Sequence, residues 1–217
     1  MSPFRPDLVD VWIFRVRTPG PTPSSGLLPG RFGSTPEDGS GGLAGAAAPG
    51  SATSARGVVP GSATPASSAA TAADLEILLL RRSPGRILPG LWQCVSGSLE
   101  SDETPTAGSL RELREETGFD AAEIAGLFDL DQVNQFHEPS YRAIVTSAVF
   151  AVRVGAAAEP VLSHEHDEMR WVSPAEALGL VIWPAYRESI RRIDENLIDP
   201  DRAIWFELTL EGDRARR

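Results

Sequence analysis

Apolar residues recur along the chain in short blocks, and the length and spacing of these blocks predict which segments form strands. Aliphatic and aromatic residues fill six such blocks, at 7–17, 74–83, 91–100, 126–137, 141–154 and 169–172. Apolar residues at even-numbered positions from Ile144 to Val154 share one face of their strand, which we expect to be buried. The third block predicts a short strand that ends in a turn at Gly97.

The polar residues between these blocks mark where helices begin and end. Thr104 is a suitable N-cap, Pro105 a suitable first helical residue and Gly118 a suitable residue after the last turn. The sequence "SPAE" at 173–176 has the pattern of a capping box, so a second helix starts there. Apolar residues at helical spacing between 184 and 197 predict a third, amphipathic helix. Strands, helix, strands and helices in this order indicate an α/β domain.

A long segment of different composition interrupts the strands. Residues 18–73 are mostly Gly, Pro, Ser, Ala and Thr, and "GSAT" occurs in it twice. Such a segment buries too little apolar surface to offset its ordering entropy, so we expect a disordered insertion that splits a hairpin. The predicted organisation is one domain over 1–17 and 74–200, the insertion over 18–73, and a C-terminal strand and tail over 201–217.

The net charge of −10 limits the kinds of molecule that the protein can bind, and the cysteine content indicates the cellular compartment. An acidic chain is a poor partner for nucleic acid polymers and anionic membranes, and an anionic ligand would need a local cation. Cys94 is the only cysteine, which excludes an intrachain disulfide and fits a cytoplasmic protein. We expect no signal peptide and no membrane span, because no apolar run approaches the roughly 18–20 residues that a span needs.

Three glutamates stand where helix electrostatics disfavours them. Glu112, Glu115 and Glu116 lie on one face of the first predicted helix, near its C-terminal end. Clustered carboxylates suit hard cations such as Mg²⁺ or Mn²⁺, and a cation would relieve both their repulsion and the conflict with the helix dipole. Arg111 stands four residues before Glu115, where a guanidinium can orient a carboxylate. An isolated acidic run would more simply be a solvated helix face.

The wider spacing resembles the Nudix box at every defined position. Gly97 is followed after five residues by Glu103, and after seven more by Arg111-Glu112-Leu113-Arg114-Glu115-Glu116-Thr117-Gly118-Phe119. The flanking sequences "EILLLRRS", "LWQCVSG" and "WVSPAEAL" also resemble this family. The resemblance covers about 74–195 and the first strand.

The resemblance implies an α/β/α sandwich with a mixed sheet, whose box binds a divalent metal, Mg²⁺ or alternatively Mn²⁺. It also implies hydrolysis of a diphosphate linked to another moiety. By position, Glu112, Glu115 and Glu116 are the candidate metal ligands and catalytic glutamates, and Arg111 orients them. Gly97 lets the backbone approach metal or phosphate, and Glu103 supports the loop. Members of the family often form dimers, so the resemblance also implies a homodimer, and the sequence pattern does not identify its interface.

The general base and the substrate are less constrained. Glu165 and His166 precede Trp171 with a spacing that resembles dihydroneopterin triphosphate pyrophosphohydrolases, so Glu165 is the predicted base. A box glutamate remains the alternative, and the three histidines are otherwise expected at the surface.

Trp92 and Gln93 resemble the entry segment of dATP and dihydroneopterin triphosphate enzymes. These two residues could bind a purine or pterin ring, and Phe136 could border the same pocket; Trp92 could equally be a packing residue. The predicted activity is metal-dependent release of pyrophosphate from a nucleoside or pterin triphosphate. The alternatives are a nucleoside-diphosphate-sugar or dinucleoside polyphosphate hydrolase, or a non-catalytic nucleotide sensor.

Overall fold

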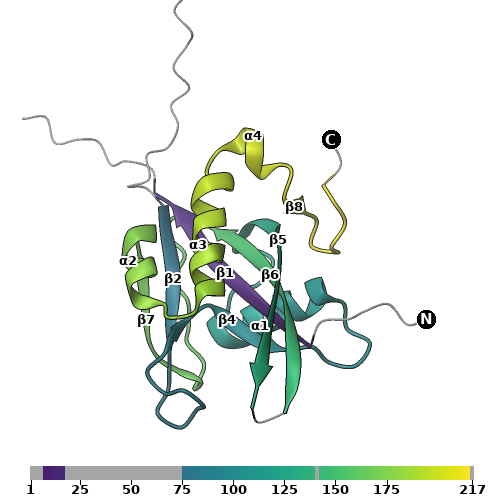
Figure 1. Ribbon diagram of the computed structural model, residues 1–217. Coiled ribbons are helices and arrows are strands. Elements are labelled where there is room, and N and C mark those ends of the chain that lie inside the picture. The colour runs from purple at the N-terminus through teal and green to yellow at the C-terminus, as the bar shows by residue number, and fades with distance from the viewer. Residues whose placement is uncertain (1–6, 18–74, 140–141, 216–217) are drawn as a thin grey trace, which may run out of the picture. The chain divides into compact units, whose positions relative to one another are not determined.

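The computed structural model describes residues 7–17, 75–139 and 142–215, which belong to one compact unit (Figure 1). The predicted insertion lies outside these residues. The strands are β1 Leu8–Val16, β2 Leu75–Arg82, β3 Trp92–Gln93, β4 Val95–Ser98, β5 Ile124–Glu138, β6 Ala143–Val154, β7 His166–Val172 and β8 Glu207–Leu208. The helices are α1 Pro105–Thr117, α2 Pro174–Leu180, α3 Pro184–Asn196 and α4 Pro200–Ala203.

The strands form one mixed sheet with β1 at its centre. The strand order is β3-β2-β1-β6-β5-β8, while β4 also pairs with β1 and β7 with β2. β1 is antiparallel to β2 and β4 but parallel to β6. Val16 pairs with Leu75, so the predicted pairing of the first strand with the strand after the insertion is confirmed.

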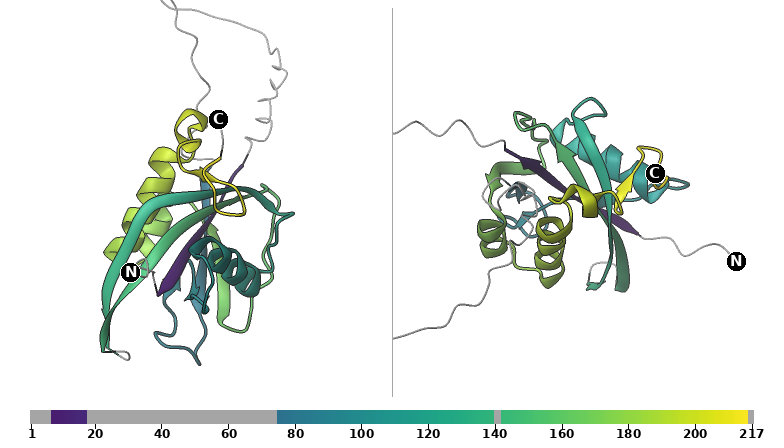
Figure 2. Two further views of the ribbon diagram at one scale, coloured as in Figure 1. Left: turned by 90° about the vertical axis from the view of Figure 1, so that its right-hand side faces the viewer. Right: turned by 90° about the horizontal axis from the view of Figure 1, so that it is seen from above.

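Helices cover both faces of this sheet, as the views from the side and from above show (Figure 2). Alternate residues of β1 divide between the faces. Val9, Val11 and Ile13 pack with Leu113 of α1, whereas Trp12 and Phe14 belong to the core cluster that contains Ile190 and Ile193 of α3. The predicted α/β/α sandwich with a mixed sheet is therefore confirmed.

Three local predictions from the sequence differ from the structure: a turn, a buried side chain and the C-terminal strand. The predicted turn at Gly97 is wrong, because Gly97 lies in β4 opposite Val9. The predicted burial of Ile144 is also wrong, since this side chain is 64% exposed near the turn of the long β5–β6 hairpin. The C-terminal strand shrinks to two residues and follows the unpredicted helix α4. No helix of the described part of the chain is long and apolar enough to cross a membrane.

Candidate functional site

The site is built at the C-terminal end of α1, and the ends of this helix are fixed by its caps. Thr104 Oγ1 accepts a hydrogen bond from the Ala107 backbone N–H at 3.2 Å. Gly118 has a φ of 73°, a conformation that glycine adopts without a steric cost, and its N–H donates to the Arg114 carbonyl. The predicted N-cap and helix end are confirmed, so the glutamates lie in the last two turns.

Arg111 is the hub of the loop that precedes α1. Its Nε and Nη2 donate to the two carboxylate oxygens of Glu103, each at 3.0 Å, and Nη2 also donates to the Ser98 carbonyl at 2.9 Å. Glu103 in turn accepts the backbone N–H of Glu100 at 3.1 Å. The hydrogen bonds with Glu103 raise the pKa of the Arg111 guanidinium, which stays charged. This bidentate pair joins the loop to the helix.

Glu112 lies against the backbone of β4. A Cβ atom at Gly97 would come within 1.9 Å of the Glu112 carboxylate carbon, so only glycine leaves room for this carboxylate. Arg111 Nη1 donates to Glu112 Oε1 at 2.8 Å. Burial raises the pKa of Glu112, and Arg111 opposes that shift.

Glu115 has different surroundings, although it belongs to the same helix face. It accepts a longer hydrogen bond of 3.3 Å from Arg111, and its side chain is 54% exposed. Arg111 therefore contacts both Glu112 and Glu115. Among residues 7–17, 75–139 and 142–215, no group of three or more His, Cys, Asp or Glu side chains is gathered as a metal site.

Glu116 is the most unusual carboxylate of the site. It is only 4% exposed, and within the described residues its buried Oε2 has no hydrogen-bond partner. Burial, followed by the nearby charge of Glu112, raises the pKa of Glu116 to about 8, while Arg82 and Arg86 lower it. An unpartnered buried carboxylate oxygen costs free energy that a bound cation would recover.

The half-buried carboxylate of Glu112 and the buried carboxylate of Glu116 thus fit a divalent ion. Magnesium sites typically use one or two carboxylates, with water and substrate phosphates completing the coordination. The oxygen-only donors and the room left by Gly97 agree with such a site.

His166 and Gln93 lie beside Glu116 inside the protein. His166 is 5% exposed, so its predicted surface position is wrong, whereas His137 and His164 are exposed as expected. His166 Nδ1 lies 3.6 Å from Glu116 Oε2, and its Nε2 lies 3.4 Å from Gln93 Nε2. Burial, then the charges of Arg82 and Arg86, lower the pKa of His166 to about 4. Sequence reasoning missed this contact because the residues are far apart along the chain.

Glu165 lies next to His166, on a segment tied to the end of α1. The backbone N–H groups of Val161 and Ser163 donate to the carbonyls of Thr117 and Glu116, at 2.8 and 3.1 Å. These bonds use carbonyls that the helix leaves unpaired. The Glu165 side chain forms an ion pair with Arg86.

Trp92 and Phe136 lie outside this hydrogen-bonded group. Trp92 is half-buried on β3, with the Arg170 guanidinium 4.7 Å from its ring centroid. Phe136 is 41% exposed near the end of β5, opposite Val145.

A buried polar pair on the α3 side of the sheet was not predicted. Asn134 Nδ2 donates to Asp10 Oδ2 at 3.1 Å, and Asp10 is 4% exposed. Burial raises the pKa of Asp10, and the neighbouring polar side chains of Ser96, Ser147 and Asn134 oppose that shift. The one available signal was an aspartate in the middle of an apolar strand.

Comparison with known proteins agrees with the fold and the box. The family model described as NUDIX domain matches residues 64–193, more than half of the chain. A solved structure of a NUDIX-type protein from Listeria monocytogenes covers 89% of this chain and 94% of its own, with 19% identity and a TM-score of 0.55, a likeness of fold.

Two curated proteins are similar in sequence. Dihydroneopterin triphosphate diphosphatase of Haemophilus influenzae is 33% identical over 130 residues, which span 56% of this chain and 80% of the relative. Octanoyltransferase of Myxococcus xanthus is 36% identical over 121 residues, 55% of this chain but only 32% of that relative. The chain thus spans about a third of the octanoyltransferase. From the family match and the fold together, this chain belongs to the Nudix hydrolase family.

Proposed function

We propose that this protein is a metal-dependent pyrophosphohydrolase that converts a nucleoside or pterin triphosphate to the monophosphate and pyrophosphate. The observation that carries the proposal is Glu116, a buried carboxylate with an unpartnered oxygen beside Glu112 at the end of α1. Burying a carboxylate costs free energy, and a bound cation would recover part of that cost.

Some residues of the site would bind the cation directly, and others would position these ligands. Glu112 and Glu116 hold Mg²⁺ or Mn²⁺, and the exposed Glu115 is a third ligand candidate. Arg111 keeps Glu112 in place, and Glu103 keeps Arg111 in place. When bound, the cation neutralises phosphate charge and lowers the pKa of water.

Arg82 and Arg86 provide positive charge around the same carboxylates, since both lower the pKa of Glu116. In an acidic protein these guanidinium groups are suited to the substrate phosphates.

Glu165 is the proposed general base. It takes a proton from water as the water oxygen bonds to phosphorus and the bridging P–O bond breaks. Its position next to His166, on the segment tied to α1, supports this role. The ion pair with Arg86 holds the Glu165 side chain in this position.

One relative and two aromatic residues support the proposed substrate class. The Haemophilus influenzae relative is named for dihydroneopterin triphosphate, which carries a flat heteroaromatic ring on a triphosphate. Trp92 and the exposed Phe136 are the side chains that we assign to stacking on a pterin or purine ring.

A substrate panel tests the proposal. Dihydroneopterin triphosphate, the common (deoxy)nucleoside triphosphates, nucleoside-diphosphate sugars and dinucleoside polyphosphates are incubated with Mg²⁺ or Mn²⁺. Added inorganic pyrophosphatase converts released pyrophosphate to phosphate, which is measured. We expect phosphate release from a triphosphate only when both the metal and the added pyrophosphatase are present. Cleavage of the sugars and dinucleotides is followed by chromatography of the nucleotide products, and cleavage confined to these compounds would move the assignment to them. Binding without turnover would indicate a sensor, and no metal-dependent turnover would contradict the proposal.

A further inference from the structure

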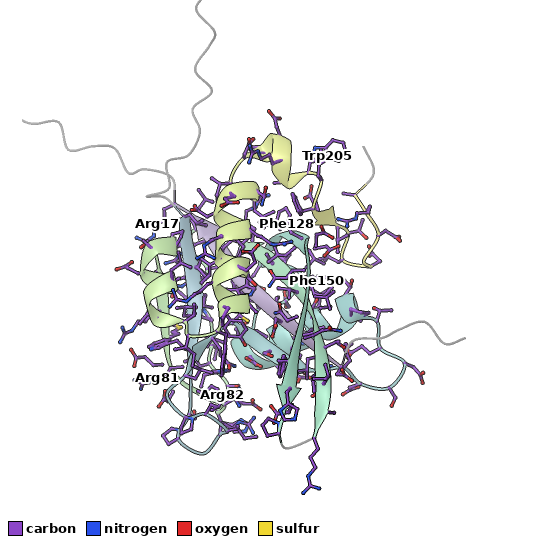
Figure 3. The ribbon with its side chains drawn as sticks, viewed as in Figure 1. Arg17, Arg81, Arg82, Phe128, Phe150 and Trp205 are labelled. Atoms are coloured by element: carbon purple, nitrogen blue, oxygen red, sulfur yellow. The ribbon has the colours of Figure 1, made fainter. Side chains whose placement is uncertain are left out.

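Four side chains from four elements form a row that leads to the carboxylate of Glu116. Arg82 stands at the end of β2 (Figure 3), Gln93 on β3, His166 at the start of β7 and Glu116 on α1. We call these residues the Glu116 row. Gln93, His166 and Glu116 are 3%, 5% and 4% exposed, so these three residues are shielded from bulk water, whereas Arg82 is half-buried.

The polar atoms of the row follow one another closely. Arg82 Nη1 donates to Gln93 Oε1 at 3.1 Å, and Gln93 Nε2 lies 3.4 Å from His166 Nε2. His166 Nδ1 lies 3.6 Å from Glu116 Oε2. Within the described residues, neither of these last two atoms has a hydrogen-bond partner.

The donors and acceptors of the row determine which nitrogen of His166 carries the proton. A guanidinium can only donate, so the atom of Gln93 that faces Arg82 is its oxygen. The amide nitrogen of Gln93 then faces His166 and donates, which makes His166 Nε2 the acceptor. An imidazole that accepts at Nε2 carries its proton on Nδ1, the nitrogen that faces Glu116.

The backbone brings His166 to this place independently of the side chains. The His166 N–H donates to the Ser163 carbonyl at 3.3 Å, and the Ser163 N–H donates to the Glu116 carbonyl at 3.1 Å. The ring is thus held beside the last turn of α1. A shift of a few tenths of an ångström would bring Nδ1 and Oε2 within hydrogen-bond distance.

We infer that His166 is a positioning residue, whose Nδ1–H fixes the Glu116 carboxylate for the divalent ion while Gln93 and Arg82 fix the ring. This inference rests on the metal site of the proposed function. It also gives Gln93 a role inside the protein, because both polar atoms of its side chain face Arg82 and His166. Hydrogen-bond partners of this kind commonly change metal affinity or activity by about 10- to 100-fold.

The test measures Mn²⁺ binding to the full-length protein without nucleotide, by electron paramagnetic resonance of the free ion. His166→Asn keeps a donor at the position of Nδ1, whereas His166→Gln places its amide nearer the position of Nε2. We expect His166→Ala and His166→Gln to weaken Mn²⁺ binding about tenfold, and His166→Asn to stay close to wild type. His164→Ala is the matched control, since His164 is exposed two residues earlier and only its carbonyl is used, by Ser83.

The outcomes separate this inference from the proposed function. Equal Mn²⁺ affinity in wild type and His166→Ala would overturn the role of His166 and leave the metal site standing. Coupling of bound Mn²⁺ to a ring nitrogen in pulsed spectra would also overturn it, because His166 would then be a ligand. Failure of the wild type to bind Mn²⁺ would contradict both proposals. If His166→Ala does not fold, the comparison of the Asn and Gln variants still decides, and equal loss in both would contradict the inference.

Discussion

At the scale of single residues, the box glutamates differ because their surroundings differ. Glu112 lies against β4, Glu115 is largely exposed, and Glu116 is buried with its pKa raised to about 8. Identical side chains within two helical turns therefore have unequal affinity for protons and cations. Each prediction for this site depends on that difference.

Glu116→Gln should abolish most activity and stabilise the protein in the absence of metal. The amide is a weaker ligand for the cation than the carboxylate, so kcat should fall at least about 100-fold. It also removes a buried acid from beside Glu112, so the fold should be retained. In EDTA the melting temperature should rise by about 2–4 °C for each kcal/mol gained. Unchanged turnover in this variant would refute the assignment of Glu116 as a ligand. Calorimetry with and without EDTA checks the stability change.

Glu165→Gln should lower kcat by about 100-fold or more with little change in KM, as loss of a general base does. Glu168→Gln is the matched control, because Glu168 lies three residues along and pairs with Arg81 and Arg170 at the surface. Steady-state kinetics on the substrate found by the panel gives both constants. A similar loss in both variants would argue against Glu165 as the base.

Asp10→Asn should flatten the dependence of stability on pH. Burial raises the pKa of Asp10 in the folded protein, so the folded state keeps a proton that the unfolded chain releases near pH 4. The contribution of this group to stability is therefore complete below that pH and is lost as pH rises through the folded pKa. Urea unfolding at several pH values checks this, and an equal pH slope in the variant would contradict it.

At the scale of elements, the site depends on the close approach of β4 and α1. Gly97 occupies the point of contact, and the Glu103–Arg111 pair holds the connecting loop. The backbone N–H groups of Val161 and Ser163 donate to the end of α1, and this brings the following residues, Glu165 and His166, to the same place. Two elements far apart in sequence thus complete the environment of one helix end.

Gly97→Ala should damage the site more than the fold. The new methyl group would collide with the Glu112 carboxylate, so this side chain must leave its place and metal affinity should fall about tenfold. The flexible Glu112 side chain can move aside, so stability should change little, within about 0.5 kcal/mol. Gly85→Ala is the matched control, because nothing lies within 4 Å of a Cβ atom built there. Mn²⁺ binding and thermal melts of both variants check this, and equal Mn²⁺ affinity in the two variants would contradict it.

At the scale of the whole molecule, the pairing of β1 with β2 shows how a long insertion is compatible with the fold. The two strands meet at Val16 and Leu75, although 58 residues separate them along the chain. The cost of closing such a loop grows only slowly with its length. The sheet can therefore form without structure in the intervening segment.

Deletion of residues 20–70 should leave catalysis largely unaffected. The connection between β1 and β2 shortens from 58 residues to 7, about three halvings, each of which stabilises by about 0.6 kcal/mol. We expect an unchanged kcat/KM and a melting temperature a few degrees higher. A large loss of kcat/KM would show that the insertion contributes to the site.

The sequence by itself determined the features that depend on residues close together along the chain. Caps, periodicity and turn residues defined α1 and the capping box of α2, and the spacing from Gly97 to Phe119 pointed to the family. These features follow from local backbone geometry, so neighbouring residues suffice to predict them.

Only the tertiary structure decided which of these residues are buried and what they touch. Asp10 and Asn134 are 124 positions apart, and Glu116 of α1 lies 3.6 Å from His166 of β7. Burial and neighbouring charge set the pKa of a carboxylate, and both come from segments that the local sequence does not contain. For the same reason the sequence could identify three glutamates, whereas the packing of α1 against the sheet singled out Glu116.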